Sequence, residues 1–74
     1  MTAQLDTKGM KCPMPIIKAK NALKDLNGGD ELRIEATDPG SVADFAAFCR
    51  TTGNDLVDST EEGGVFVFVI RKAA

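Results

Sequence analysis

The sequence predicts an α/β protein, a two-layer α/β sandwich in which two helices pack on one face of a four-stranded mixed sheet. Four short segments have the apolar patterns of strands, and two longer segments carry apolar residues at helical spacing. Turn residues separate the six segments, whose order is βαβαββ. Because 74 residues bury enough surface for one core only, we expect residues 1–74 to form a single domain.

The first part of the chain predicts a strand and a helix joined by a loop that contains a cysteine. Gln4–Asp6 is a short candidate strand. Cys12 follows it, and Pro13 and Pro15 fit a first helical turn, where backbone N–H groups have no acceptor within the helix. The glycines of Asn27–Gly29 are expected to end this helix. Its apolar stripe consists of Ile16, Ala19, Leu23 and Leu26.

The middle of the chain predicts a second strand and a second helix. Glu31–Ala36 alternates apolar and polar residues, which is typical of a strand with one buried face. Ser41 and Asp44 have the spacing of a capping box, which predicts a helix start, and Gly53 is expected to close that helix. The core-facing stripe is expected to be Val42, Phe45, Ala46 and Cys49.

The last part predicts an antiparallel hairpin. Leu56–Glu61 and Val65–Arg71 flank the glycine-containing turn Glu62–Gly64. The second arm is apolar on both faces, which favours a central strand with Phe66 and Phe68 as its largest core side chains.

The composition excludes several functional classes. The chain has no histidine, which excludes Ser/His/Asp and Cys/His catalysis and histidine-ligated metals. A net charge of −2 and the lack of Trp and Tyr argue against direct nucleic-acid binding. The longest apolar run, Val65–Ile70, is too short to span a membrane. Since the first residues show no secretory signal, we expect a cytoplasmic protein.

Positive charge is concentrated near the amino terminus. Met1–Lys24 contains five lysines and one acidic residue, whereas Asp25–Ala74 contains four basic and ten acidic residues. Such a patch is either an ordinary solvated face or a binding surface. Its position around Cys12 favours a binding surface. In this interpretation, a partner binds a cationic rim that consists of Lys8, Lys11, Lys18 and Lys20.

Cys12 is the candidate reactive group. A cysteine directly before a helix lies at the positive end of the helix dipole, and Lys8 and Lys11 add positive charge, so we expect its thiolate to be favoured. The alternative is that Cys12 is a small apolar residue at a helix start. Position 15 is proline, so the C-x-x-C spacing of dithiol oxidoreductases is absent and Cys12 is better suited to carry an adduct.

The remaining candidates predict neither a metal nor a cofactor. Cys49, on the apolar stripe of the second helix, is expected to be a core residue. Two thiols without histidine fall short of a tetrahedral zinc site unless two chains combine. The glycine pairs match neither the P-loop nor G-x-G-x-x-G.

The sequence resembles the TusA (SirA-like) sulfur carriers over nearly its whole length. The signature is the C-P-x-P element Cys12-Pro13-Met14-Pro15 at the start of the first helix. The other matching residues are Leu5-Asp6, Gly9, Gly29, Asp38-Pro39, Phe48-Cys49, Gly53 and the closing Phe68-Val69-Ile70-Arg71-Lys72.

The resemblance implies a sulfurtransferase that accepts sulfane sulfur as a persulfide on Cys12 and relays it to a cysteine of an acceptor protein. The implied donor is a cysteine desulfurase or a rhodanese-like protein, and relatives serve tRNA thiolation, molybdenum-cofactor synthesis or sulfur oxidation. Met14 is a candidate partner contact beside Cys12. The alternative is a non-catalytic protein- or nucleic-acid-binding module that uses the Lys-rich first helix, with Cys12 structural or regulatory.

Overall fold

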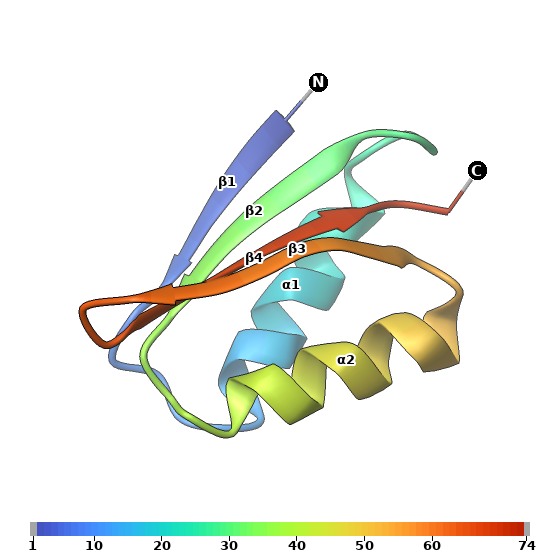
Figure 1. Cartoon of the computed structure of the whole chain (residues 1–74). Coiled ribbons are helices and arrows are strands. Elements are labelled where there is room, and N and C mark those ends of the chain that lie inside the picture. Colours follow the sequence, from blue (N-terminus) through green and yellow to red (C-terminus); the bar gives the residue numbers. More distant parts are fainter. Residues whose placement is uncertain (1, 74) are drawn as a thin grey trace.

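One mixed sheet and two helices make up the structure, a computed structural model that describes residues 2–73 (Figure 1). The elements, in chain order, are β1 (Thr2–Thr7), α1 (Met14–Lys24), β2 (Glu31–Ala36), α2 (Ser41–Thr52), β3 (Asp55–Glu62) and β4 (Val65–Arg71). The strand order is β1-β2-β4-β3, with β1 parallel to β2 and both other pairs antiparallel. Both helices cover the same face of the sheet (Figure 1). The predicted fold class and element order are confirmed.

The core lies between the two central strands and the helices. Alternation in β2 buries its apolar residues, and Ile34 pairs with Phe68 of β4. The ring of Phe68 lies 4.7 Å from that of Phe45, so β4 and α2 meet at two aromatic side chains. Central placement of β4 and burial of Phe68 confirm the prediction, while Phe66 is partly buried. The other buried apolar residues are Ala19, Leu23, Leu32, Ala36, Cys49 and Ile70.

Helix α1 begins at the prolines, as predicted, and ends earlier than predicted. Pro13 is the N-cap, and Pro15 lies in the first turn with its side chain fully buried. The helix stops at Lys24, where Asp25 keeps a right-handed conformation. Gly29, at φ +91°, instead shapes the turn into β2, so the expectation that glycines end this helix is wrong.

Helix α2 faces the core with a stripe that differs from the predicted one. Phe45 and Cys49 are buried as expected, whereas Val42 is 42% exposed and Ala46 is also exposed. Ser41 takes the inward position one turn before Phe45, at the i, i+4 spacing of one helix face. The N-cap is Gly40 and not Ser41. The predicted capping box is therefore wrong. The Ser41 Oγ is buried with no hydrogen-bond partner among residues 2–73.

The β3–β4 hairpin closes through Gly63 and Gly64, which have φ values of +58° and +84°. Two consecutive positive φ angles suit a two-residue hairpin turn and favour glycine at both positions. On the sheet face opposite the helices, ion pairs join Arg33 to Glu35 at 3.5 Å and Arg71 to Glu31 at 3.0 Å. None of the helices within residues 2–73 has the length and apolar character needed to cross a membrane.

The buried β2 position gives a direct test of the core. Ile34→Val should lower the free energy of unfolding by about 0.5–1.5 kcal/mol, because it removes a methyl group from a close-packed site. Ile17→Val removes the same group from a side chain that is 44% exposed. This matched control should change stability by less than about 0.5 kcal/mol. Urea unfolding measures both, and equal losses would contradict the placement of the core.

Candidate active site

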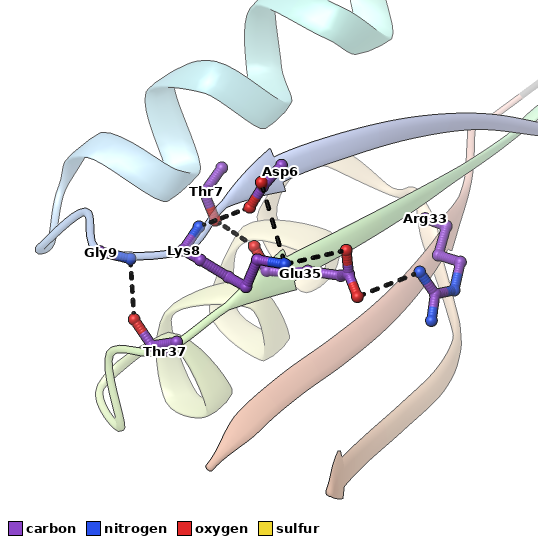
Figure 2. Close-up of polar contacts among 7 residues, drawn as sticks. All are labelled: Asp6, Thr7, Lys8, Gly9, Arg33, Glu35 and Thr37. Carbon is purple, nitrogen blue, oxygen red and sulfur yellow. Dashed lines mark hydrogen bonds and ion pairs between the residues drawn. The ribbon is translucent and has the colours of Figure 1, made fainter. Parts of the chain in front are cut away.

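Two loops meet at one edge of the sheet because β1 and β2 are parallel. Their carboxyl ends lie side by side, so the loop that follows β1 approaches the loop that follows β2. The Gly9 N–H donates to Thr37 Oγ1 at 2.9 Å, and Thr7 Oγ1 donates to the carbonyl of Glu35 at 2.7 Å (Figure 2). These bonds fix the loop that carries Cys12.

The carboxylate of Asp38 anchors Cys12 itself. The Cys12 N–H donates to Asp38 Oδ2 at 2.9 Å, and the Gly40 N–H donates to Asp38 Oδ1 at 3.1 Å. These hydrogen bonds, together with the nearby charge of Lys11, lower the pKa of Asp38, although partial desolvation opposes them. Asp38 therefore acts as an ionised clamp between two backbone segments.

Cys12 lies exposed between two hollows of the surface, each of about 350 Å³. The loop hollow is formed with Gly9, Met10, Lys11, Thr37, Asp38 and Pro39. The helix groove separates α1 from α2 and is formed with Pro13, Ile16, Asp44, Ala47, Phe48, Thr51 and Thr52. A reactant can approach the sulfur from either side.

The electrostatic environment of Cys12 is the reverse of the predicted one. The pKa of the thiol is raised, chiefly because it hydrogen-bonds to Asp44, with further contributions from desolvation and from the negative charges of Asp44 and Asp38. The start of α1 offers little to oppose this. Met14 donates its N–H to the carbonyl of Lys11, and Pro15 has no N–H to donate. The expectation that the thiolate is favoured is therefore wrong.

The predicted cationic rim is also incomplete. Lys8 lies 3.8 Å from Glu35 and 4.0 Å from Asp6 (Figure 2). It lines neither of the two hollows beside Cys12. Lys11 does line the loop hollow beside Cys12. Lys18 is exposed and lines none of the three hollows considered among residues 2–73.

Lys20 belongs to a third hollow further along the two helices. This lysine hollow, of about 180 Å³, shares Phe48 and Thr52 with the helix groove. Its other lining residues are Leu23, Lys24, Asn54 and Lys72. The helix groove thus runs from Cys12 to a group of three lysines, two of which the sequence did not single out. They could not be grouped from local spacing, because Lys72 follows β4, far from α1 in the chain.

Apolar side chains accompany the exposed cysteine. Met14 is 40% exposed and Ile17, one turn along the same helix, is 44% exposed. Cys49 is buried as predicted, and burial followed by the charge of Asp55 raises its pKa. Both thiols are free. Within residues 2–73, no group of three or more Cys, Asp or Glu side chains could hold a metal ion.

The fold and this site define a class of protein. It is a small α/β protein that presents one cysteine at the start of its first helix and keeps its second cysteine in the core. The family model described as sulfurtransferase TusA matches residues 3–72, and the chain belongs to that family.

Several relatives match over most of their length. The sulfur carrier protein TusA of Allochromatium vinosum is 51% identical over 70 residues, which are 95% of this chain and 92% of that protein. A putative sulfur carrier protein of Neisseria meningitidis is 51% identical over 67 residues, 90% of each chain. The crystal structure of a SirA-like protein from Desulfitobacterium hafniense covers 100% of both chains with a TM-score of 0.84. At 22% identity, that likeness shows the fold alone.

The Asp38 clamp predicts a pH-dependent effect on stability. Because the pKa of Asp38 is lowered in the folded protein, its contribution is fully present above the ordinary aspartate pKa of about 3.9 and is lost as the pH falls through the lower folded value. Asp38→Asn should therefore destabilise the protein at neutral pH and have a smaller effect near pH 3. Urea unfolding at both pH values measures this. An effect of equal size at both would contradict the clamp.

Proposed function

We propose that the chain is a sulfur carrier that holds sulfane sulfur as a persulfide on Cys12. The observation that supports this most directly is the exposure of Cys12 within the C-P-x-P element, while Cys49 is buried. Membership of the TusA family and relatives named as sulfur carriers support the same role. A reducing compartment such as the cytoplasm suits this chemistry, since it keeps both thiols free.

The proposed transfer moves one sulfur atom without net oxidation. The Cys12 sulfur attacks the terminal sulfur of a donor persulfide, a new S–S bond forms, and the S–S bond of the donor breaks. The cysteine sulfur of the donor leaves with the electron pair of that bond and takes up the proton that Cys12 loses. In the second step an acceptor thiolate removes the terminal sulfur in the same way, and Cys12 returns to the thiol.

The residues around Cys12 supply position rather than acid–base catalysis. Asp38 holds the Cys12 N–H, and the Gly9–Thr37 hydrogen bond holds the preceding loop. Pro13 and Pro15 restrict the backbone at the helix start, where Pro15 also packs into the core. This support keeps the sulfur at the surface between the loop hollow and the helix groove.

The partners we infer are a donor protein with a persulfide, such as a cysteine desulfurase or a rhodanese-like protein, and an acceptor protein with a reactive cysteine. Met14, two residues after Cys12 in the chain, offers an exposed apolar contact. Lys11 lines the loop hollow beside Cys12, and Lys20 lines the lysine hollow, which shares Phe48 and Thr52 with the helix groove. An acidic partner surface would complement both lysines.

Sulfur loading tests the role of each cysteine. After incubation with a persulfide donor, Cys12 should gain one reducible sulfur and Cys49 none, because only Cys12 is accessible. Cys12→Ser should abolish transfer with the fold intact. Cys49→Ser should keep transfer and lose about 1–3 kcal/mol of stability from a buried hydroxyl.

Intact-mass and peptide analysis locate the sulfur, and urea unfolding measures the stability of both variants. Normal transfer by Cys12→Ser would refute the carrier role. A Cys12→Ser protein that still binds a partner without accepting sulfur would show that recognition and transfer are separate.

Partner recognition predicts a difference between lysines. Lys11→Gln and Lys20→Gln should each slow association with an acidic partner a few-fold at low salt, with little change in dissociation. Lys8→Gln is the matched control and should leave the rate unchanged, since Lys8 pairs with Glu35. The differences should shrink as salt shortens the Debye length to about 8 Å or less. Stopped-flow transfer rates measure this, and three equal effects would contradict the assigned surface.

A further inference from the structure

The helix groove and the lysine hollow form one continuous track on the surface, because both are lined by Phe48 and Thr52 of α2. The two helices begin close together and diverge toward their carboxyl ends (Figure 1). The α1 residues that line the track recur at helical spacing on one face: Ile16, Lys20, Leu23 and Lys24. The track therefore has Cys12 at one end and the lysines at the other.

The two ends of this track carry opposite charge. Asp44 supplies a negative charge to the end that contains the cysteine. Lys20, Lys24 and Lys72 line the far end, where none of the other lining residues is acidic. Within the described part of the chain, neither Lys20 nor Lys24 forms an ion pair. Lys72 donates to a backbone carbonyl at 2.6 Å, which holds its ammonium group in place without neutralising the charge.

The middle of the track is apolar. Ile16, Ala47 and Phe48 line the helix groove, and Leu23 lines the lysine hollow. Apolar walls favour a ligand side chain that leaves water on binding. The charges at the two ends then fix the direction of that ligand, since like charges that face each other disfavour the reverse order.

We propose that this track is the docking site for an extended segment of the acceptor protein. The segment places its cysteine at Cys12, an apolar side chain in the helix groove, and acidic side chains at Lys20 and Lys24. This inference rests on the proposed carrier function, because the cysteine of the segment is the thiol that removes the sulfur. Asp44 disfavours an acidic residue directly beside that cysteine, so the charges of the track select the order of the segment.

The length of the track sets the spacing within the segment. From Met14 to Lys20 and Lys24, α1 rises about 9 and 15 Å at 1.5 Å per residue. An extended chain covers that span with about three to five residues at about 3.3 Å each. We therefore expect acidic residues about three to five positions from the cysteine. Because alternate side chains of an extended segment face the same way, one apolar residue between them can enter the groove.

Binding of short peptides to the unloaded protein tests the docking site without any sulfur transfer. The probe is the blocked peptide Ser-Thr-Val-Thr-Glu-Glu, in which serine stands for the cysteine. Its control is Ser-Thr-Val-Thr-Gln-Gln, which lacks the charge. At low salt, the Glu peptide should bind about threefold or more tightly than the Gln peptide. NMR titration measures both affinities and should show shifts at Phe48 and Thr52.

Lysine variants locate the charged end of the track. Lys20→Gln and Lys24→Gln should each weaken binding of the Glu peptide about two- to fivefold and leave binding of the Gln peptide unchanged. Lys18→Gln is the matched control, because Lys18 is exposed on the same helix and lines none of the three hollows. Equal losses in all three variants would overturn the proposal, since they would show an effect of net charge alone.

Two further results would overturn the docking site. One is the absence of binding by the Glu peptide. The other is tighter binding by a single-stranded RNA, hexauridine, with a loss in Lys20→Gln, which would assign the lysines to phosphate groups instead of a protein segment.

Sulfur transfer to cysteine peptides tests the order of the segment. Cys-Thr-Val-Thr-Glu-Glu should remove sulfur from loaded Cys12 about threefold or more faster than Cys-Glu-Glu-Thr-Val-Thr, which has the same composition. Each rate is divided by that of the same peptide with glutathione persulfide, which corrects for differences between the peptide thiols. Equal corrected rates would overturn the proposed order. A protein that binds the Glu peptide but accepts no sulfur would refute the carrier function and not the docking site.

Discussion

The carboxylate of Asp38 binds two backbone N–H groups, and the position of Cys12 depends on it. Cys12 and Asp38 are 26 residues apart and belong to different loops. They meet because β1 and β2 are parallel neighbours, which places the loops after both strands at the same edge of the sheet. Without this bridge, the Cys12 loop would keep the bond from Gly9 to Thr37, the ion pair of Lys8 with Glu35 and its local turns. The sheet topology thus decides where the Cys12 sulfur lies.

The same topology accounts for the charge around the sulfur. The loop that supplies Asp38 leads directly into α2, so Asp44 in the first turn of that helix lines the helix groove together with Cys12. A carboxylate in a first turn is favoured by the helix dipole, which helps α2 to start where Ser41 provides no cap. One residue therefore stabilises the helix and raises the pKa of the thiol. The Asp38 carboxylate fixes the backbone at Cys12 and Gly40, and the negative charges of Asp38 and Asp44 raise the pKa of the Cys12 thiol.

The fold was predictable because its patterns are local. Alternation fixes the bounds of β2, and the two prolines mark the start of α1. The predicted core-facing stripe of α2 was wrong in its first turn. Val42 and Ser41 are adjacent, and the apolar character of Val42 favoured it as the buried residue. The packing of α2 beside Phe68 requires Phe45 and the residue one turn before it to face inward, which makes Ser41 the buried one.

The site was predictable only in part. Cys12 and its prolines form a contiguous motif, so the sequence identifies them directly. Asp38 and Asp44 look like turn and capping residues in the sequence, and their contacts to Cys12 arise from strand pairing between distant segments. Lys8 shows the converse, since it is close to Cys12 in the chain and yet pairs with Glu35 on β2. A charged residue that is close to Cys12 in the sequence therefore need not act on the Cys12 sulfur when the loop between them turns.

The placement of the two cysteines restricts where a carried sulfur can go. Cys49 is buried in α2, and burial raises its pKa, so it lacks both the access and the thiolate character that an attack on Cys12 requires. A persulfide on Cys12 therefore has no resolving thiol among residues 2–73 in the folded protein. In the proposed function, the sulfur would stay on Cys12 until a thiol from another molecule reached it through the loop hollow or the helix groove. Burial of Cys49 thus disfavours disulfide formation within the chain, which is consistent with the proposed transfer to another protein.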